Sequence, residues 1–120
     1  MQREVLVTLK SLVDKLGLSI CCAGESLNSD VTGGYAGDLL SDVIANSNAG
    51  NIWVTMQVHV NIVAVAVLKD LSAIILVNGR KPAEETLRKA VDEKITILMS
   101  TLPAFETIGR LYASGISTSP

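Results

Sequence analysis

The sequence predicts a three-layer α/β domain with a mostly parallel sheet of four or five strands. Residues 71–99 read as strand, tight turn, helix and strand, which is a βαβ unit with an expected right-handed crossover. Segments of strand and helix character also alternate almost strictly along the rest of the chain. With 120 residues, 48% of them hydrophobic, the chain can bury one core, so we expect a single domain over residues 1–120.

The composition argues against several classes of protein. Lys and Arg total 10 against 12 Asp and Glu, and aromatic residues make up 3%, so neither a basic footprint nor stacking platforms for nucleic acid are present. The longest apolar run, Ile62–Leu68, is too short to span a bilayer, and the charged N-terminal segment does not resemble a signal peptide. We therefore expect a cytoplasmic protein with neither nucleic acid nor a membrane as a partner.

The first helix is predicted over residues 9–16. Thr8 is a suitable N-cap, apolar residues recur at helical spacing, and Gly17 follows as a stop. Leu18–Cys22 carries no charge and is expected to be a strand buried on both faces. Residues 4–7 are ambiguous and allow a short strand.

Residues 30–38 contain three glycines and favour an irregular strand. Asp38 is then expected to cap a helix over residues 39–45, whose buried stripe comprises Leu39, Leu40, Val43 and Ile44. Residues 46–50 have the composition of a turn, and Ile52–Met56 has that of a strand.

Residues 58–68 are rich in β-branched side chains, which favours a strand. Joined to the preceding strand, however, they would form one of unusual length, so we predict a fully buried helix from Gln57 or Val58 to Lys69.

The βαβ unit follows, with strands at Ser72–Val77 and Ile95–Met99 and a helix at Ala83–Glu93. Pro82 suits the first helical position, and the face toward the sheet is expected to comprise Ala83, Leu87, Ala90 and Val91.

A last helix is predicted within residues 101–113, with its buried face comprising Phe105, Ile108, Leu111 and Tyr112. We expect the small-residue tail, Gly115–Pro120, to be frayed.

Three polar clusters are candidate ligand sites. Thr32, Gly33 and Gly34, together with Asp38, could form a backbone nest for an anion or let two subunits approach closely, and a purely structural turn is the alternative. The second cluster surrounds His59, which is either a proton carrier or a hydrogen-bonded structural residue.

The third cluster is the turn Asn78, Gly79, Arg80, Lys81. Its two cations precede a helix start and suit a phosphate or carboxylate, unless they are simply solvated.

No set of residues predicts catalysis or a metal site. An enzyme using His59 as acid or base beside Arg80 and Lys81 remains an alternative, although we expect a non-enzyme. Cys21 and Cys22 are either ordinary strand residues or part of a redox site completed across subunits, because two thiols cannot hold a four-thiolate cluster alone. The sequence leaves any cofactor unknown.

At these same positions the chain resembles the DRTGG-domain family. Residues 30–34, DVTGG, match its name motif with Val31 in place of arginine. The match continues through residues 33–43, 53–59, 77–82 and 104–106, and is most similar to the freestanding, hydrogenase-associated form of the domain.

The resemblance implies a fold like the N-terminal domain of HPr kinase and a regulatory module. We therefore expect a non-catalytic homodimer that senses a small anionic ligand of nucleotide or phosphate type, or docks on a metabolic enzyme. The alternative is a redox or iron–sulfur accessory of a hydrogenase-type complex, which predicts visible absorbance after anaerobic purification.

Overall fold

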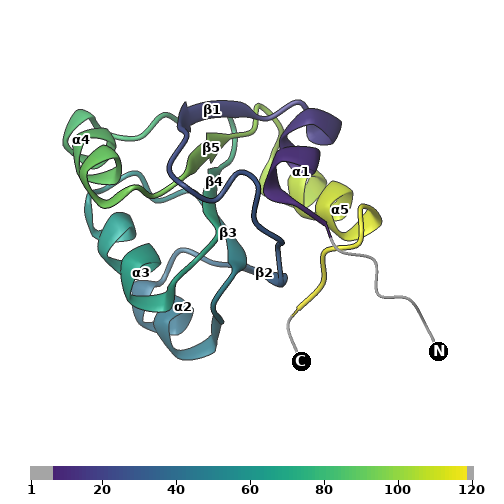
Figure 1. Cartoon of the computed structure of the whole chain (residues 1–120), viewed down its shortest axis with the longest axis horizontal. Helices are drawn as coiled ribbons and strands as arrows, with labels where there is room; N and C mark the ends of the chain where they lie inside the picture. Colours follow the sequence, from purple (N-terminus) through teal and green to yellow (C-terminus); the bar gives the residue numbers. More distant parts are fainter. Residues whose placement is uncertain (1–6, 119–120) are drawn as a thin grey trace.

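A computed structural model describes residues 7–118, which form one sheet between two layers of helices (Figure 1). The elements in chain order are α1 (Leu9–Leu16), β1 (Ser19–Cys22), β2 (Gly33–Ala36), α2 (Leu40–Asn46), β3 (Asn51–Thr55), α3 (Asn61–Lys69), β4 (Ala73–Leu76), α4 (Glu84–Glu93), β5 (Ile97–Met99) and α5 (Ala104–Ala113). The predicted fold class, and the βαβ unit within it, are confirmed.

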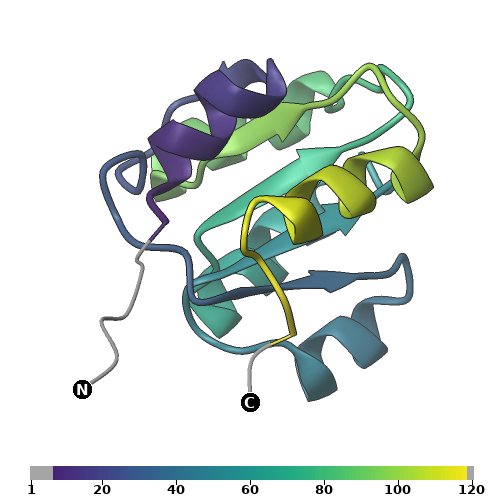
Figure 2. The same ribbon diagram turned by 90° about the vertical axis from the view of Figure 1, so that its right-hand side faces the viewer.

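The sheet has the strand order β1-β5-β4-β3-β2. The strands β2, β3, β4 and β5 are mutually parallel, and β1 joins β5 in antiparallel orientation. Because β2 to β5 follow one another both in sequence and in space, three crossovers of the same hand place α2, α3 and α4 on one face (Figure 1). The helices α1 and α5 cover the other face (Figures 1 and 2).

The core has two parts, one on each face of the sheet. The strands β3 and β4 are buried along their whole length, as expected for central parallel strands covered on both sides. Helix α1 has the predicted bounds. The Thr8 hydroxyl accepts from the Ser11 N–H at 3.2 Å, and Gly17 adopts φ 64°. Within the described residues, no helix is both long and apolar enough to span a bilayer.

The prediction that Leu18–Cys22 is buried on both faces is wrong. The strand β1 lies at the edge of the sheet, with Ser19 and Ile20 exposed. An uncharged segment was compatible with either position, because only the pairing order decides which strand is outermost. Of the possible strand at 4–7, residues 4–6 lie outside the described residues. Val7 is described and accepts a hydrogen bond from the Val31 N–H.

The helices α2 and α3 begin later in the chain than predicted, and more of their side chains are exposed. Helix α2 begins at Leu40, and Leu39 is 68% exposed rather than part of a buried stripe; Ile44 is also exposed. Helix α3 begins at Asn61, and Val67 and Leu68 face solvent, so the helix is not fully buried. Each helix packs against the sheet on one side only, which leaves apolar residues on its outer side.

The last two helices also bury different faces from those predicted. Pro82 precedes α4 by two positions instead of starting it. The exposed side chains of α4 include Val91, and its most buried ones are Thr86 and Ala90. In α5, Phe105 is 90% exposed and Tyr112 is exposed, while Thr107 and Leu111 face inward.

The described part of the C-terminal tail, residues 115–118, packs against the sheet. Ile116 is buried, and the Ser117 carbonyl accepts from the Gly34 N–H at 3.0 Å, so the tail lies along the outer edge of β2. The prediction of a frayed tail is therefore wrong for residues 115–118, and residues 119–120 lie outside the described part.

Candidate functional site

The loops that follow the four parallel strands are connected to one another at the C-terminal edge of the sheet. Asp38, after β2, reaches across to the end of β3. Its Oδ1 accepts from the Thr55 hydroxyl at 2.7 Å and from the Met56 N–H at 2.8 Å. Asp38 therefore does not cap α2 as predicted, because Leu39 occupies the N-cap position without a side-chain bond. The carboxylate instead fixes the β2–α2 loop to the β3–α3 loop.

The next connection joins the loops after β3 and β4. The Val58 carbonyl accepts from the Ala83 N–H at 3.2 Å and from the Thr86 hydroxyl at 2.7 Å. The Asn78 side-chain amide also lies 3.7 Å from the Met56 sulfur. These contacts hold the segment that carries His59 against the start of α4.

The loops after β4 and β5 are joined through their backbones. The Asn78 N–H donates to Leu102 O at 2.9 Å, and the Gly79 N–H donates to Ser100 O at 2.8 Å. Asn78 and Gly79 both adopt left-handed conformations, with φ 59° and 67°. The helices α4 and α5 leave this point on opposite faces of the sheet, and such a divergence is where open α/β sheets commonly bind ligands.

Arg80 and Lys81 project from this point with their charges unpaired. Both are exposed, and within residues 7–118 neither takes part in an ion pair. The N–H groups of Asn78 and Gly79 are already used by the neighbouring loop, so anion binding here depends on the two cationic side chains. The predicted third cluster is therefore an exposed, braced turn with two available positive charges.

The first predicted cluster is divided between the two ends of the sheet. Thr32 and Gly33 lie at the N-terminal ends of the strands, where Gly33 pairs with Asn51, whereas Asp38 lies at the C-terminal edge. The Thr32 hydroxyl donates to Ala49 O at 2.7 Å and accepts from the Asn51 side chain at 3.1 Å. Gly34 lies within β2, against the C-terminal tail. These bonds agree with the structural-turn alternative for Thr32 and Gly33.

His59 lies at the same edge as Asn78, in the loop before α3, and its side chain is exposed. Within the described residues its imidazole makes no hydrogen bond, and its carbonyl accepts from the Ile62 N–H. Among the described residues, His59 therefore has no carboxylate partner of the kind that orients a catalytic base.

The two cysteines of β1 differ in environment. Cys22 is buried, and Cys21 is half-buried near Lys81. Burial raises the pKa of the Cys21 thiol, and the positive charge of Lys81 offsets this only in part. Among residues 7–118 no group of three His, Cys, Asp or Glu side chains is placed to hold a metal ion. The redox alternative, which needs a second subunit, stays a prediction.

Sequence reasoning missed the groups that brace the site. Ser100 and Leu102 act through backbone carbonyls, which leave no signal in side-chain patterns. The pairing of Thr55 with Asp38 depends on the register of β2 against β3, which the sequence does not show. The predicted residues that the structure does bring to one edge are Asp38, His59, Asn78, Gly79, Arg80 and Lys81.

Taken together, the fold and this edge define a three-layer α/β module whose polar loops meet at the ends of its parallel strands. A solved structure with this architecture comprises the CBS and DRTGG domains of the regulatory region of Clostridium perfringens pyrophosphatase, complexed with its activator, diadenosine tetraphosphate. The two superpose with a TM-score of 0.73 at 18% sequence identity, over 92% of this chain and 48% of the other.

This similarity confirms the DRTGG-type fold expected from the motifs. The chain spans about half of that regulatory region. No family model matches the sequence, and no curated protein does.

Proposed function

We propose that the protein is a non-catalytic regulatory module that senses a small anionic ligand of nucleotide or phosphate type. The observation that carries the proposal is the Asn78–Lys81 turn, which presents two cations that form no ion pair within residues 7–118, at the point where α4 and α5 diverge. Arginine and lysine side chains held at such a position suit phosphate oxygens, through forked hydrogen bonds and charge respectively.

The structural neighbour supports this class of function. It is the regulatory region of an enzyme, and its ligand is a dinucleotide with four phosphates. The geometry of the turn supports the charge of the ligand. Because Asn78 and Gly79 are held by Leu102 and Ser100, the adjacent cations are presented from a fixed backbone. Binding would therefore require little ordering of the turn.

Thermal unfolding with a panel of ligands tests the proposal. The probes are diadenosine tetraphosphate, ATP and inorganic phosphate. A ligand at 100 times its Kd adds about 2.7 kcal/mol to the free energy of unfolding, which raises the Tm by roughly 8–12 °C in a domain of this size. We expect a saturable shift with at least one probe, and its loss in the double variant Arg80→Ala/Lys81→Ala.

The matched control is Lys10→Ala/Lys15→Ala, which removes the same charge from exposed positions on α1. This variant should retain the shift, because α1 packs near β1 and β5 on the face opposite α4 (Figure 1). Absence of a shift with all three probes, or equal loss of the shift in both double variants, would contradict an anion site at this turn.

We further propose that the module forms a homodimer or docks on a metabolic enzyme through exposed apolar side chains. These side chains occur on both helical layers: Leu68 and Val91 lie on α3 and α4, and Phe105 and Tyr112 lie on α5 at the opposite face of the sheet. Light scattering at tens of micromolar should give twice the chain mass of 12.7 kDa. A strict monomer would exclude the dimer and leave docking on a different protein as the role of these side chains.

A further inference from the structure

A trough runs along the α5 face of β2 and β3, and its outer end, lined by Met56 and Val77, adjoins Asn78 of the cationic turn. It consists of two adjoining hollows, of about 140 Å³ beneath the C-terminal tail and about 230 Å³ at the C-terminal edge of the sheet. Both hollows are lined by Ala36, Val54 and Ile108, which mark where they meet. We call the first the inner hollow and the second the outer hollow.

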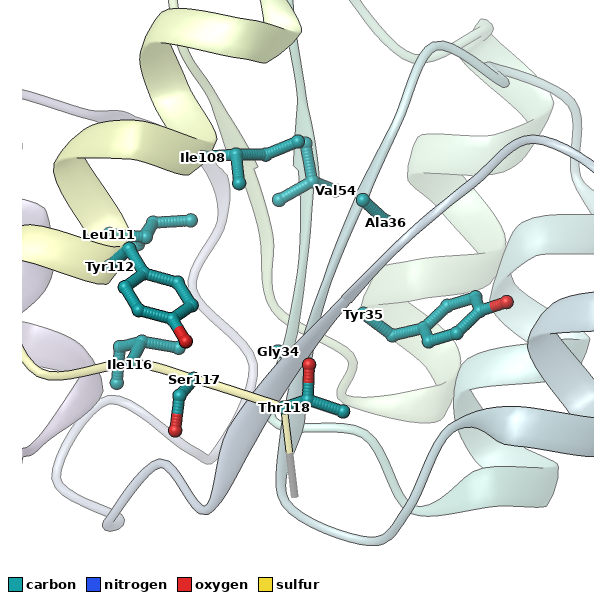
Figure 3. Close-up of a pocket in the computed structure, with 10 residues that line it drawn as sticks. All are labelled: Gly34, Tyr35, Ala36, Val54, Ile108, Leu111, Tyr112, Ile116, Ser117 and Thr118. Carbon is teal, nitrogen blue, oxygen red and sulfur yellow. The ribbon is translucent and has the colours of Figure 1, made fainter. Parts of the chain in front are cut away.

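The inner hollow is apolar and sized for one ring. Its walls include Leu111 of α5 and Ile116 of the tail, and Figure 3 shows both side chains on the side of α5. Gly34 contributes no side chain; a Cβ there would lie 3.2 Å from Ile116 Cγ2. Tyr35 points away from the hollow, and its hydroxyl donates to Asp42. An apolar cavity of about 150 Å³ accommodates benzene, so a six-membered ring or a compact alkyl group fits here.

The outer hollow carries one negative charge. Of the described residues lining the two hollows, Asp38 alone is charged. Its Oδ1 is occupied by Thr55 and Met56, but within residues 7–118 no hydrogen bond or ion pair reaches its Oδ2. The outer hollow therefore favours a cation and disfavours the phosphate-type ligand proposed for Arg80 and Lys81.

The spacing of the two hollows limits the length of a ligand. Asp38 lies two residues beyond Ala36, which corresponds to at most about 6.6 Å of extended backbone. We propose that the trough binds a small amphipathic amine, with a ring-sized apolar group in the inner hollow and an ammonium group beside Asp38. This site differs from the anion site in its residues and in the charge that it favours, although both lie at the C-terminal edge of the sheet.

Titration of ¹⁵N-labelled protein with 2-phenylethylamine tests the proposal. Saturable shifts at the Gly34, Ala36 and Ile116 amides are expected with a dissociation constant of about millimolar, as is usual for so small a ligand. The neutral 2-phenylethanol should bind about two- to fivefold more weakly, the range that an exposed charge pair contributes, and the anionic 3-phenylpropionate more weakly still.

Two variants separate the ring from the charge. Ala36→Leu places a larger side chain in both hollows and should abolish binding of all three probes. Asp38→Asn retains the Oδ1 acceptor for Thr55 and Met56, and should remove the preference for the amine while leaving the alcohol unaffected. The controls Ala45→Leu and Asp92→Asn make the same changes at exposed positions on α2 and α4 and should behave as the parent chain.

Three outcomes would overturn the proposal. They are the absence of saturable shifts at the three amides, equal binding of amine and carboxylate, and an amine preference that survives in Asp38→Asn. Because none of them involves Arg80 or Lys81, a failure here is distinguishable from a failure of the anion site.

Discussion

Replacing Gly24 with alanine is expected to destabilise the domain by about 3 kcal/mol or more. Gly24 adopts φ 56°, a conformation that already costs an L-residue about 1–2 kcal/mol. A Cβ at this position would lie 2.6 Å from the Thr96 nitrogen and 2.8 Å from the Ile95 carbonyl carbon. Both atoms belong to the backbone and cannot move without displacing the chain that enters β5.

The displaced residue also holds a local hydrogen-bond network. The Thr96 hydroxyl donates to Ala23 O at 2.7 Å and lies 2.8 Å from the Ser26 hydroxyl, and Thr96 is almost completely buried. Moving it would therefore disturb the connection between the β1–β2 loop and the start of β5.

Urea denaturation of Gly24→Ala, with Gly79→Ala as the control, measures this effect. Gly79 has a similar φ of 67°, but a Cβ there would meet nothing within 4 Å. The free energy of unfolding of the control should decrease only by the cost of the left-handed backbone conformation, about 1–2 kcal/mol. Equal losses in the two variants would show that the contact with Thr96 relaxes at no cost.

Replacing Trp53 with alanine is expected to cost about 3–5 kcal/mol, a large part of the roughly 5–15 kcal/mol available to a domain. Trp53 lies at the centre of β3, is completely buried, and packs in the core beneath α2 and α3. Its indole N–H donates to the Gly37 carbonyl at 2.8 Å. The same side chain therefore fills the core and fixes the residue that precedes Asp38.

The variant Trp53→Phe separates these two roles. Phenylalanine retains an aromatic ring in the core but cannot donate to Gly37. The free energy of unfolding of Trp53→Phe should therefore decrease by about 1–2 kcal/mol. Calorimetry or urea denaturation of both variants provides the comparison. If Trp53→Phe is as unstable as Trp53→Ala, the hydrogen bond to Gly37 contributes more than the packing does. If the free energy of unfolding of Trp53→Ala falls by less than about 2 kcal/mol, the core has collapsed around the cavity.

The elements that were predicted most accurately are those whose local signals are complete within the segment. Helix α1 combines a capping threonine, an apolar stripe and a terminal glycine, and its bounds are as predicted. The βαβ unit was also predicted with only small shifts in its ends, because two β-branched strands flank a helix with polar spacing. Local hydrogen-bonding and burial preferences were sufficient in both cases.

Predictions of burial were less accurate where burial depends on packing against another helix or strand. The uncharged segment Leu18–Cys22 became an exposed edge strand, and the apolar residues Phe105 and Val91 face solvent. Apolar periodicity indicates which residues can be buried, but the helix rotation that buries Leu111 and exposes Phe105 is set by packing against the sheet. The burial of Ile116 similarly depends on Gly34, which is distant in sequence.

For the candidate site, the sequence by itself determined the residue types: a turn with two cations, a histidine and a carboxylate after predicted strands. Only the tertiary structure decided which of them share an edge, because that depends on strand order and direction. Parallel pairing of β2 to β5 brings Asp38, His59 and the Asn78–Lys81 turn to one end and leaves Thr32 at the other. The same pairing directs Asp38 to Thr55 and not to the start of α2, since a short side chain binds the nearest donors that the fold supplies.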